Sequence, residues 1–599
     1  MIQKIKKISV TILLFATSLA FFATIYTIHI WSDIYFEQIL IALENGGHGA
    51  GHNIITSYIY FALIPAVVLT LITFMLNVSN RLLLSVSVIF LFFSLYKTSF
   101  FEYVIHKHTY SKIYQTEYVN PQNIAFNFPN KKRNLILLYV ESMEKDYANS
   151  QLTGRNLIPN LTALAEQNIS FDGFKQIPTQ DHTISSIVSG HCGIPYKHSK
   201  IKNYNDFRNF LPTATCFSDI LKQNGYKNYF IQGADIAFAR KGLFFETHGY
   251  DYVTGIADFE KLYGPKLAEH QGTSWGYKDS TYYEVIKKQI TEIANKEEPF
   301  AFTFLTLDTH GPDIYLDEKC EKTNRLDKDV IACADKMAIE FIEWVQQQDF
   351  YENTTVVIIG DHPVTGSNKM YPQHKERQIV NIILNPYSDK PLNLNRKWTT
   401  VDIAPTILNS LGIEFNEGKF GLGRSLYMQG ETLYEKHDKK FLTELLKSSK
   451  DYEQFNRLTY TFKPKYNKYH EFDTTIEGNE NIKHYASFSD IEFNLIWLDT
   501  ISLTLPHNNN DLLLNFDFRI LFMENKQRII KVFANDILID TLTYSHTVSQ
   551  PIQQQIKIPA HLIKDDKKLK IEFRGEDIGH SAISVGIGML RFNIKPALN

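Results

Sequence analysis

Three apolar stretches near the beginning of the chain constrain its fold more than any other feature of the sequence. They cover residues 8–31, about 55–76, and 82 to about 105. Each is long enough for a bilayer-crossing helix, for which roughly 20 apolar residues suffice. Lys97 and Glu102 interrupt the third stretch, but both lie toward one end, where a long side chain can reach the interface. We therefore expect a transmembrane anchor of three helices over residues 1–105, and not a cleaved signal peptide.

The basic residues around these stretches predict the orientation of the chain. Lys4, Lys6 and Lys7 precede the first stretch, and Arg81 lies in the short loop between the second and third. By the positive-inside rule, the N-terminus and this loop face the cytoplasm. Three crossings then place everything after about residue 105 outside the cytoplasm. The net charge of −3 gives no indication of a nucleic-acid partner.

A domain of alternating strand-like and helix-like segments begins at about residue 134. The strand-like runs lie at 134–144, 227–232, 300–307, 355–359 and 379–384, and the helix-like segments lie at 157–167, 217–224, 282–293, 332–348 and 401–411. Strands that alternate with helices favour a mostly parallel sheet with helices on both faces. We therefore predict an α/β domain over residues 134–435, joined to the anchor by a connector over residues 106–133.

The chain changes character beyond this domain. Residues 436–470 begin with a charged, helix-compatible segment that indicates a linker. After it, strand-like runs at 512–518, 529–533, 537–542, 552–558, 569–573 and 583–587 are separated by turn residues such as Asn535-Asp536. This pattern predicts a separate all-β domain over residues 471–599, of the sandwich kind.

Four cysteines fall in the part of the chain that we predict to be exported: Cys192, Cys216, Cys320 and Cys333. An even number there indicates disulfides, and proximity in sequence favours Cys192 with Cys216 and Cys320 with Cys333. Neither pair has the spacing of a zinc knuckle, so we do not expect these cysteines to bind a metal.

Polar side chains end two of the predicted strands, and a threonine begins a predicted helix between them. Glu141 interrupts the first apolar run, Asp361 and His362 follow the run at 355–359, and Thr183 opens an apolar, helix-compatible segment. Catalytic groups gather at strand ends in an open α/β sheet, so these side chains make a credible one-metal phosphoryl-transfer site with Thr183 as the nucleophile. Taken alone, a threonine at a helix start more often only caps the helix. The three motifs together favour the catalytic interpretation.

Seven short motifs follow one another between about residues 134 and 425. They are VES (140–142), HTISSIVSGHCGIP (182–195), YFIQGADIAFARKGLFFETHGYD (229–251), WGYKD (275–279), LDTHGPD (307–313), GDH (360–362) and GLGRS (421–425). Together they resemble the alkaline-phosphatase/sulfatase superfamily, and within it the membrane-bound phosphoglycerol transferases. The resemblance to the lipoteichoic acid synthases is more distant. The resemblance to the superfamily implies an alkaline-phosphatase-like sheet for the catalytic domain.

The resemblance implies a metal site. In that superfamily a Glu, the nucleophilic Thr and an Asp-His pair hold the metal, and they match Glu141, Thr183, Asp361 and His362. These hard to borderline ligands favour one divalent ion, Mn²⁺ first and Zn²⁺ or Mg²⁺ as alternatives. A divalent ion would make the threonine hydroxyl a better nucleophile and would polarise the phosphoryl oxygens.

The resemblance also implies substrate contacts. His310 and Arg240 would face the phosphoryl oxygens. The guanidinium of Arg240 suits a two-pronged contact with phosphate. Phe238 matches an aromatic that precedes this Arg in the lipoteichoic acid synthases, and Trp275 is either a substrate contact or part of the pocket wall. Where those synthases have a His before the stretch, this chain has Gly233.

The resemblance implies a function at the bacterial inner membrane, with a multi-pass anchor and the catalytic domain on the periplasmic side. The expected reaction moves glycerol phosphate from phosphatidylglycerol to a hydroxyl of an exported glycan, through an intermediate on Thr183. The all-β domain would then select the glycan. One alternative is a phosphoethanolamine transferase, and another is an inactive, membrane-tethered glycan-binding protein. A sulfatase is not expected, since no C/S-x-P-x-R motif follows the nucleophile position.

Overall fold

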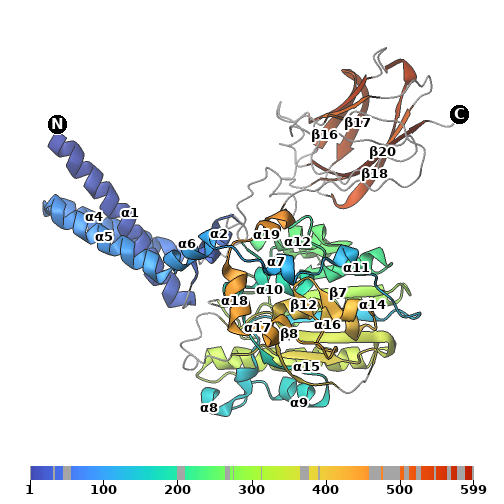
Figure 1. Cartoon of the computed structure of the whole chain (residues 1–599), viewed down its shortest axis with the longest axis horizontal. Helices are drawn as coiled ribbons and strands as arrows, with labels where there is room; N and C mark the ends of the chain where they lie inside the picture. Colours follow the sequence, from blue (N-terminus) through green and yellow to red (C-terminus); the bar gives the residue numbers. More distant parts are fainter. Residues whose placement is uncertain are drawn as a thin grey trace. The chain divides into compact units, whose positions relative to one another are not determined.

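The structure is a computed structural model, in which two compact units can be separated. It describes residues 2–31, 34–44, 56–197, 210–263, 270–273, 275–311, 313–364, 377–388, 392–456, 474–475, 500–504, 512–520, 528–544, 548–562, 568–575 and 587–596. The first unit comprises Met1–Asn203 and Asn209–Leu458, and the second comprises Tyr204–Arg208 and Thr459–Asn599. Figure 1 shows the elements of each unit.

Three of the described helical stretches are long and apolar enough to cross a membrane: Lys6–Ile30, Thr56–Met75 and Asn80–Lys97. They belong to α1 (Ile2–Trp31), to η1 (Ile59–Leu63) with α4 (Ile64–Met75), and to α5 (Asn80–Lys97). Large apolar side chains such as Ile12, Leu71 and Ile89 are exposed on them, as expected of helices that face lipid.

The third predicted stretch is wrong at its far end. The helix α5 ends at Lys97 rather than near residue 105, and a separate helix, α6 (Phe100–His108), follows. Between them Ser99 has a φ of 54°, in the left-handed region that ends a right-handed helix. An apolar run cannot reveal such a break, because both helices have apolar residues.

Six of the described strands of the first unit form one sheet in the order β4-β3-β7-β1-β8-β9, and the others pair in two-stranded sheets. Their bounds are β4 (Tyr252–Thr254), β3 (Lys227–Gln232), β7 (Phe300–Leu305), β1 (Asn134–Val140), β8 (Thr354–Gly360) and β9 (Asn381–Leu384). All neighbours are parallel except β8 and β9. The prediction of an α/β domain with a mostly parallel sheet is therefore confirmed.

Alternate residues of the central strand β1 pack against helices on opposite faces of the sheet. Leu135, Leu137 and Tyr139 share a buried cluster with α10 (Thr183–Cys192), α11 (Phe217–Gln223) and α16 (Ile403–Ser410). Ile136, Leu138 and Val140 share the other cluster with α9 (Pro159–Gln167), α14 (Asp279–Ala294) and α15 (Leu326–Gln346). This alternation follows from the two-residue period of a strand and explains why β1 is apolar throughout.

The helix α15 begins at Leu326, earlier than the predicted start at residue 332. Its first turn is polar and contains Asp327 and Asp329, and the Asp329 carboxylate accepts a hydrogen bond from the Thr323 hydroxyl at 2.7 Å. Acidic residues are favourable at the positive end of a helix, but they carry no apolar periodicity. The prediction from periodicity therefore missed this turn.

Segments on both sides of the predicted domain pack onto it. In the predicted connector, α7 (Ile113–Thr116) contributes Ile113 and Tyr114 to the same buried cluster as α10. After residue 435, α18 (Lys439–Leu446) contributes Phe441 and Leu445 to that cluster. The packed core of the first unit thus extends beyond the interval between the first and last motifs on both sides.

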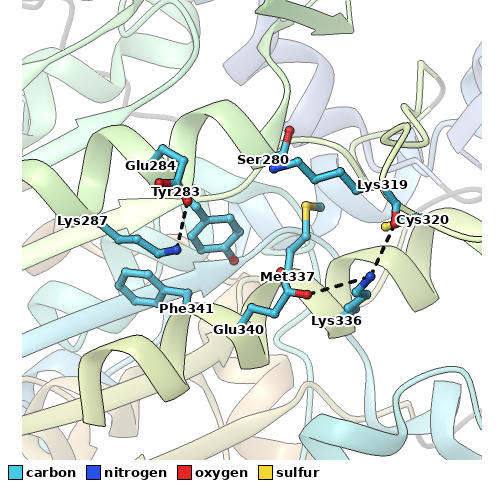
Figure 2. Close-up of a pocket in the computed structure, with 10 residues that line it drawn as sticks. All are labelled: Ser280, Tyr283, Glu284, Lys287, Lys319, Cys320, Lys336, Met337, Glu340 and Phe341. Atoms are coloured by element: carbon cyan, nitrogen blue, oxygen red, sulfur yellow. Dashed lines mark hydrogen bonds and ion pairs between the residues drawn. The ribbon is translucent and has the colours of Figure 1, made fainter. Parts of the chain in front are cut away.

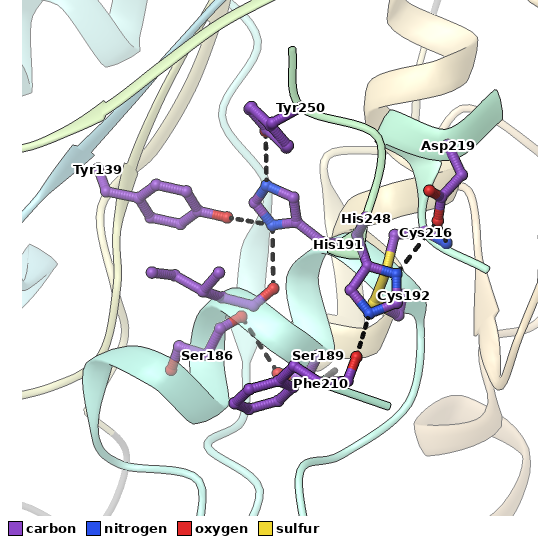
Figure 3. Close-up of a disulfide and its surroundings, with 11 residues drawn as sticks. Tyr139, Ser186, Ser189, His191, Cys192, Phe210, Cys216, Asp219, His248 and Tyr250 are labelled. Carbon is purple, nitrogen blue, oxygen red and sulfur yellow. Dashed lines mark hydrogen bonds and ion pairs between the residues drawn. A yellow bond between two sulfur atoms is a disulfide. The ribbon is translucent and has the colours of Figure 1, made fainter. Parts of the chain in front are cut away.

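The two predicted disulfides are present. Cys192 at the end of α10 bonds to Cys216, which precedes α11, as Figure 3 shows, and Cys320 bonds to Cys333 in α15. These pairings confirm the prediction from sequence proximity.

The described strands of the second unit form two antiparallel sheets, in the orders β13-β14-β19-β16-β17 and β18-β15-β20. Their bounds are β13 (Thr474–Thr475), β14 (Thr500–Thr504), β15 (Leu512–Ile520), β16 (Arg528–Ala534), β17 (Ile537–Tyr544), β18 (Val548–Ile558), β19 (Lys568–Gly575) and β20 (Ile587–Pro596). Asn535 and Asp536, with φ of 47° and 69°, make the tight turn between β16 and β17. Of the predicted strand at 583–587, residues 583–586 lie outside the described residues.

Candidate active site

The ends of three adjacent strands bring the predicted site residues together. The register pairs Val140 of β1 with Gly360 of β8, so Glu141 and Asp361 follow their strands at the same level of the sheet. On the other side of β1, Tyr139 pairs with Leu305 of β7, after which the chain runs to His310. Because all three strands are parallel, their carboxyl ends form one edge, where such sites are found.

Three of the predicted metal ligands lie within reach of one ion. One ligand atom each from Glu141, Asp361 and His362 lies within 4.8 Å of the others, and all three residues are buried. His362 Nε2 is 3.3 Å from Asp361 Oδ2 and 3.8 Å from Glu141 Oε1. The Thr183 hydroxyl lies 3.4 Å from Glu141 Oε2. Three of the four predicted ligands therefore face one point, and the hydroxyl of the fourth, Thr183, lies beside Glu141.

The residues at this point fit a divalent cation. Asp361 Oδ2 is buried and accepts no hydrogen bond among the described residues. Burial and the nearby Glu141 raise the pKa of Asp361 to about 6. Two buried carboxylates at this spacing repel each other unless a positive charge lies between them. Carboxylate oxygens together with one imidazole suit Zn²⁺ or Mn²⁺.

The imidazole of His362 presents a lone pair to this point. Its Nδ1 lies 3.0 Å from the Pro363 carbonyl oxygen, which can only accept a hydrogen bond, so Nδ1 carries the proton. The Nε2 lone pair is then available to a metal, the arrangement that a second hydrogen bond gives to metal-binding histidines. Burial acts to lower the pKa of His362, but Asp361 and Glu141 outweigh it and raise the pKa.

Thr183 lies where α10 begins, and only this end of the helix opens to the site. Every residue from 184 to 192 is buried, whereas Thr183 is partly exposed. The first N–H groups of a helix have no acceptors within the helix and carry a partial positive charge. The hydroxyl therefore lies at a position that favours an approaching phosphate.

Hydroxyl groups of the segment TLDTH (residues 306–310) form hydrogen bonds with the Glu141 backbone and hold it in place. The Glu141 N–H donates to the Thr306 hydroxyl at 3.0 Å, and the Thr309 hydroxyl donates to the Glu141 carbonyl at 2.6 Å. Ser142, at a φ of 53°, donates its N–H to Asp361 Oδ1 at 2.8 Å. These contacts connect β1, β7 and β8 at the site, and the sequence prediction gave none of them a role.

A hollow opens beside Thr183. Its lining includes the predicted residues Glu141, Thr183, Phe238, Trp275 and His310, together with Gln232, Ala234, Asp235, Lys241, Leu305 and Leu307. The rings of Trp275 and His310 lie 4.4 Å apart, and those of Phe238 and Trp275 lie 5.1 Å apart. Burial, with Lys241 and His362 nearby, lowers the pKa of His310 to about 4, so this imidazole is neutral at pH 7.

Arg240 lies differently from the other predicted residues. It is not among the residues that line the hollow, and its guanidinium lies over the Phe210 ring, 5.3 Å from the centroid. The next residue, Lys241, lines the hollow instead. The predicted contact of Arg240 with phosphate is therefore not among the contacts seen here, and it stays a prediction.

Two buried aspartates, which the sequence prediction did not assign, brace the His310 segment. The carboxylate of Asp279, the first residue of α14, accepts from the N–H groups of Leu307 at 2.8 Å and Asp308 at 3.1 Å. In return, Asp308 accepts from the Asp279 N–H at 3.1 Å. Burial raises the pKa values of both carboxyl groups, and so do the charges of Glu141 and Asp317 at Asp279 and of Asp279 at Asp308. The motifs WGYKD and LDTHGPD contain these residues, so their joint occurrence was the available signal.

Another hollow and another cluster of side chains are weaker candidates for a functional site. The hollow in Figure 2 contains three lysines, of which Lys287 pairs with Glu284 and Lys336 with Glu340. The cluster of Cys192, Cys216 and His248 contains sulfurs that are already joined in a disulfide (Figure 3). A cysteine binds a metal as a thiolate, and these two cysteines are in a disulfide, so this cluster does not fit a metal.

Comparisons with known proteins agree with this geometry. The Sulfatase family model matches residues 133–413. Phosphoglycerol transferase I of Escherichia fergusonii is 31% identical over 322 residues, which are 52% of this chain and 41% of the relative. The protein of the same name from Salmonella paratyphi B is 30% identical over 321 residues, with the same coverage of 52% and 41%. This chain thus spans about two fifths of the length of these curated relatives.

Among solved structures, a lipoteichoic acid synthase from Listeria monocytogenes is 17% identical with a TM-score of 0.41. The match covers 51% of this chain and 79% of that one. The residues that the family model matches begin directly before β1 and include the four residues that we predict to bind the metal, Glu141, Thr183, Asp361 and His362. The Sulfatase family model thus matches the part of this chain that contains the candidate site, residues 133–413.

Proposed function

We propose that this protein is a metal-dependent phosphoglycerol transferase of the bacterial inner membrane. It takes glycerol phosphate from phosphatidylglycerol and transfers it to a hydroxyl of an exported glycan. The observation that supports this most is the Thr183 hydroxyl, 3.4 Å from Glu141 at the edge of a three-ligand cluster. Relatives named phosphoglycerol transferase I support the choice of donor.

In this proposal the metal is held by Glu141, Asp361, His362 and Thr183, and Mn²⁺ is the expected ion. When bound, it lowers the pKa of the Thr183 hydroxyl and draws charge from the phosphoryl oxygens. In the first displacement, Thr183 Oγ1 attacks phosphorus and loses its proton. The bond from phosphorus to the diacylglycerol oxygen breaks, and that oxygen takes a proton. Glycerophosphoryl-Thr183 remains.

The second displacement reverses the first with a different alcohol. A glycan hydroxyl attacks phosphorus and loses its proton, the bond from phosphorus to Thr183 Oγ1 breaks, and the threonine regains a proton. Two in-line displacements retain the configuration at phosphorus. His310 is neutral at pH 7, so it supplies a hydrogen bond to a phosphoryl oxygen rather than a full charge. Phe238 and Trp275 form the apolar wall beside it.

The anchor and the second unit serve the two substrates. We propose that the three apolar helices keep the domain on the periplasmic side of the membrane, beside its lipid donor. The antiparallel sheets of the second unit would bind the acceptor glycan. Removal of residues 459–599 should then change acceptor preference while leaving diacylglycerol release from the donor unaffected.

The test is to incubate the purified full-length protein with phosphatidylglycerol labelled in the head-group glycerol, Mn²⁺ and a periplasmic glucan. The proposal predicts that diacylglycerol forms and that the label moves to the glucan. Thr183→Ala should do neither. Release from phosphatidylethanolamine at a higher rate than from phosphatidylglycerol would favour the phosphoethanolamine alternative. No release from either lipid would refute the enzymatic proposal.

A further inference from the structure

Lys241 is a buried cation at the candidate active site. It is the first residue of α12 (Lys241–Thr247), and 5% of its surface is exposed. It lines the same hollow as Thr183, Glu141 and His310. Lysine is rarely buried to this extent unless a partner compensates its charge.

The backbone before Lys241 has an unusual conformation. Ala239 and Arg240 have φ of 53° and 59°, so two consecutive residues other than glycine lie in the left-handed region. Each of them costs free energy there, because the Cβ atom approaches the following carbonyl group. The Gly242 N–H donates to the Ile236 carbonyl at 2.8 Å, which closes the turn. Such strain is found where a side chain must be directed for function.

This turn separates the two neighbouring cations. The Arg240 guanidinium lies over the Phe210 ring, whereas Lys241 lies at the hollow with its ammonium 5.1 Å from the Phe238 centroid. Without the turn, a helical or extended backbone would place these side chains differently relative to the hollow. The conformation of Ala239 and Arg240 therefore determines which of the two positively charged side chains lines the hollow beside Thr183.

The Lys241 ammonium has no acceptor among the described residues. Within the part of the chain that the structure describes, it makes neither a hydrogen bond nor an ion pair, and its close contact is the Phe238 ring. An ammonium that lines a hollow and has no acceptor among the described residues leaves its donors to water or to an anion. An anion in the hollow would supply the missing acceptors.

We propose that Lys241 binds the non-bridging oxygens of the transferring phosphoryl group. This inference rests on the proposed function, since it names the phosphate-binding residue of that site. Lys241 forms no covalent bond in either displacement. Its charge opposes the negative charge that gathers on the phosphoryl oxygens, in a site where burial strengthens the attraction. The ammonium is a compact charge with three donors, which suits oxygens that move as phosphorus changes partner.

The test measures binding of inorganic phosphate to the full-length, Mn²⁺-loaded protein in detergent by calorimetry. Lys241→Met should weaken phosphate binding about tenfold or more, the usual effect of losing a charge-assisted hydrogen bond. Lys287→Met is the matched control, with the same new side chain at a lysine that lines the other hollow and pairs with Glu284. It should bind phosphate within about twofold of the unchanged protein. If Lys241→Met does not fold, Lys241→Gln gives the same comparison.

The proposal predicts that Lys241→Met leaves the melting temperature unchanged or raises it, because an apolar side chain of similar length replaces a charge without a protein acceptor. A merely structural role for Lys241 predicts a lower melting temperature instead. A lower melting temperature with unchanged phosphate affinity would overturn the proposal. Phosphate binding lost equally in both variants, or absent in the unchanged protein, would also overturn it.

The phosphate measurement separates this proposal from the proposed function. It needs no lipid and no acceptor, so it can succeed even if phosphatidylglycerol is not the donor. Conversely, Thr183→Ala should abolish transfer but retain phosphate binding within a few-fold. Lys241→Met should lower kcat more than it raises KM for the lipid, because the lysine opposes charge in the transition state.

Discussion

Removal of the Cys192–Cys216 disulfide should cost stability without impairing the chemistry of the folded protein. The perturbation is the double variant Cys192→Ala with Cys216→Ala. The bond joins residues 24 apart in sequence. The chain-entropy relation for a closed loop of that length gives a stabilisation of about 3.5 kcal/mol at 25 °C, most of it from restricting the unfolded chain.

Other contacts hold α10 in its place when this bond is absent. The Ser189 hydroxyl donates to Thr400 Oγ1 at 2.8 Å, and His191 Nε2 lies 3.1 Å from the Tyr250 hydroxyl (Figure 3 shows His191 and Tyr250). Residues 184–192 are all buried. Thr183 at the other end of the helix should therefore keep its position, and kcat/KM of the folded double variant should stay within about twofold of the unchanged protein.

The assay is urea unfolding of the full-length protein in detergent, followed by tryptophan fluorescence, together with transfer activity at low temperature. The matched control is Cys320→Ala with Cys333→Ala, which opens a loop of 13 residues. The same relation gives that bond about 3 kcal/mol, slightly less than the first. A loss below about 1 kcal/mol for Cys192–Cys216 would refute the entropic reasoning. A fall in kcat/KM of tenfold or more in the folded variant would show that α10 needs the bond to position Thr183.

Three further predictions concern the site. Chelation with EDTA should abolish transfer, and Mn²⁺ should restore it. Asp361→Asn should lower metal affinity by about tenfold or more, as measured by metal analysis after dialysis. Full metal content in that variant would contradict the assignment of Asp361 as a ligand. The raised pKa of Asp279 and of Asp308 means that the folded protein holds a proton that the unfolded chain releases near the ordinary value of 3.8. This contribution to stability is complete below that pH and is lost as the pH rises from there through the raised values, so Asp279→Asn should flatten the decline in unfolding free energy over that range; an unchanged pH profile would contradict the raised pKa of Asp279. Thr309→Val removes the 2.6 Å hydrogen bond to the Glu141 carbonyl and should lower kcat severalfold with little change in KM; an unchanged kcat would show that Glu141 is held without it.

The metal-site residues could be predicted because buried parallel strands leave a strong signal. The run before Glu141 is apolar at every position since β1 is covered on both faces, and the run before Asp361 is apolar for the same reason. If both runs are parallel strands, the two carboxylates must lie at the same edge of the sheet. The grouping of Glu141, Asp361 and His362 therefore followed from pattern and fold together.

The position of Arg240 could not be predicted in the same way. Whether Arg240 or Lys241 faces the hollow depends on the left-handed conformation of Ala239 and Arg240. Glycine or asparagine would have signalled such a turn, but alanine and arginine do not. The end of α5 at Lys97 is a similar case, since the break depends on the conformation of Ser99. Local backbone geometry, rather than residue type, decided both.

The identity of the nucleophile is the claim on which the proposed function depends most. It is tested by mixing the Mn²⁺-loaded protein with phosphatidylglycerol in the absence of an acceptor glycan, quenching in acid, and digesting the protein for mass spectrometry. The proposed function predicts that the peptide containing Thr183 gains the mass of one glycerophosphoryl group, and that this mass disappears when glycan is added before the quench. An unmodified Thr183 peptide in protein that is releasing diacylglycerol, or full transfer by Thr183→Ala, would contradict it.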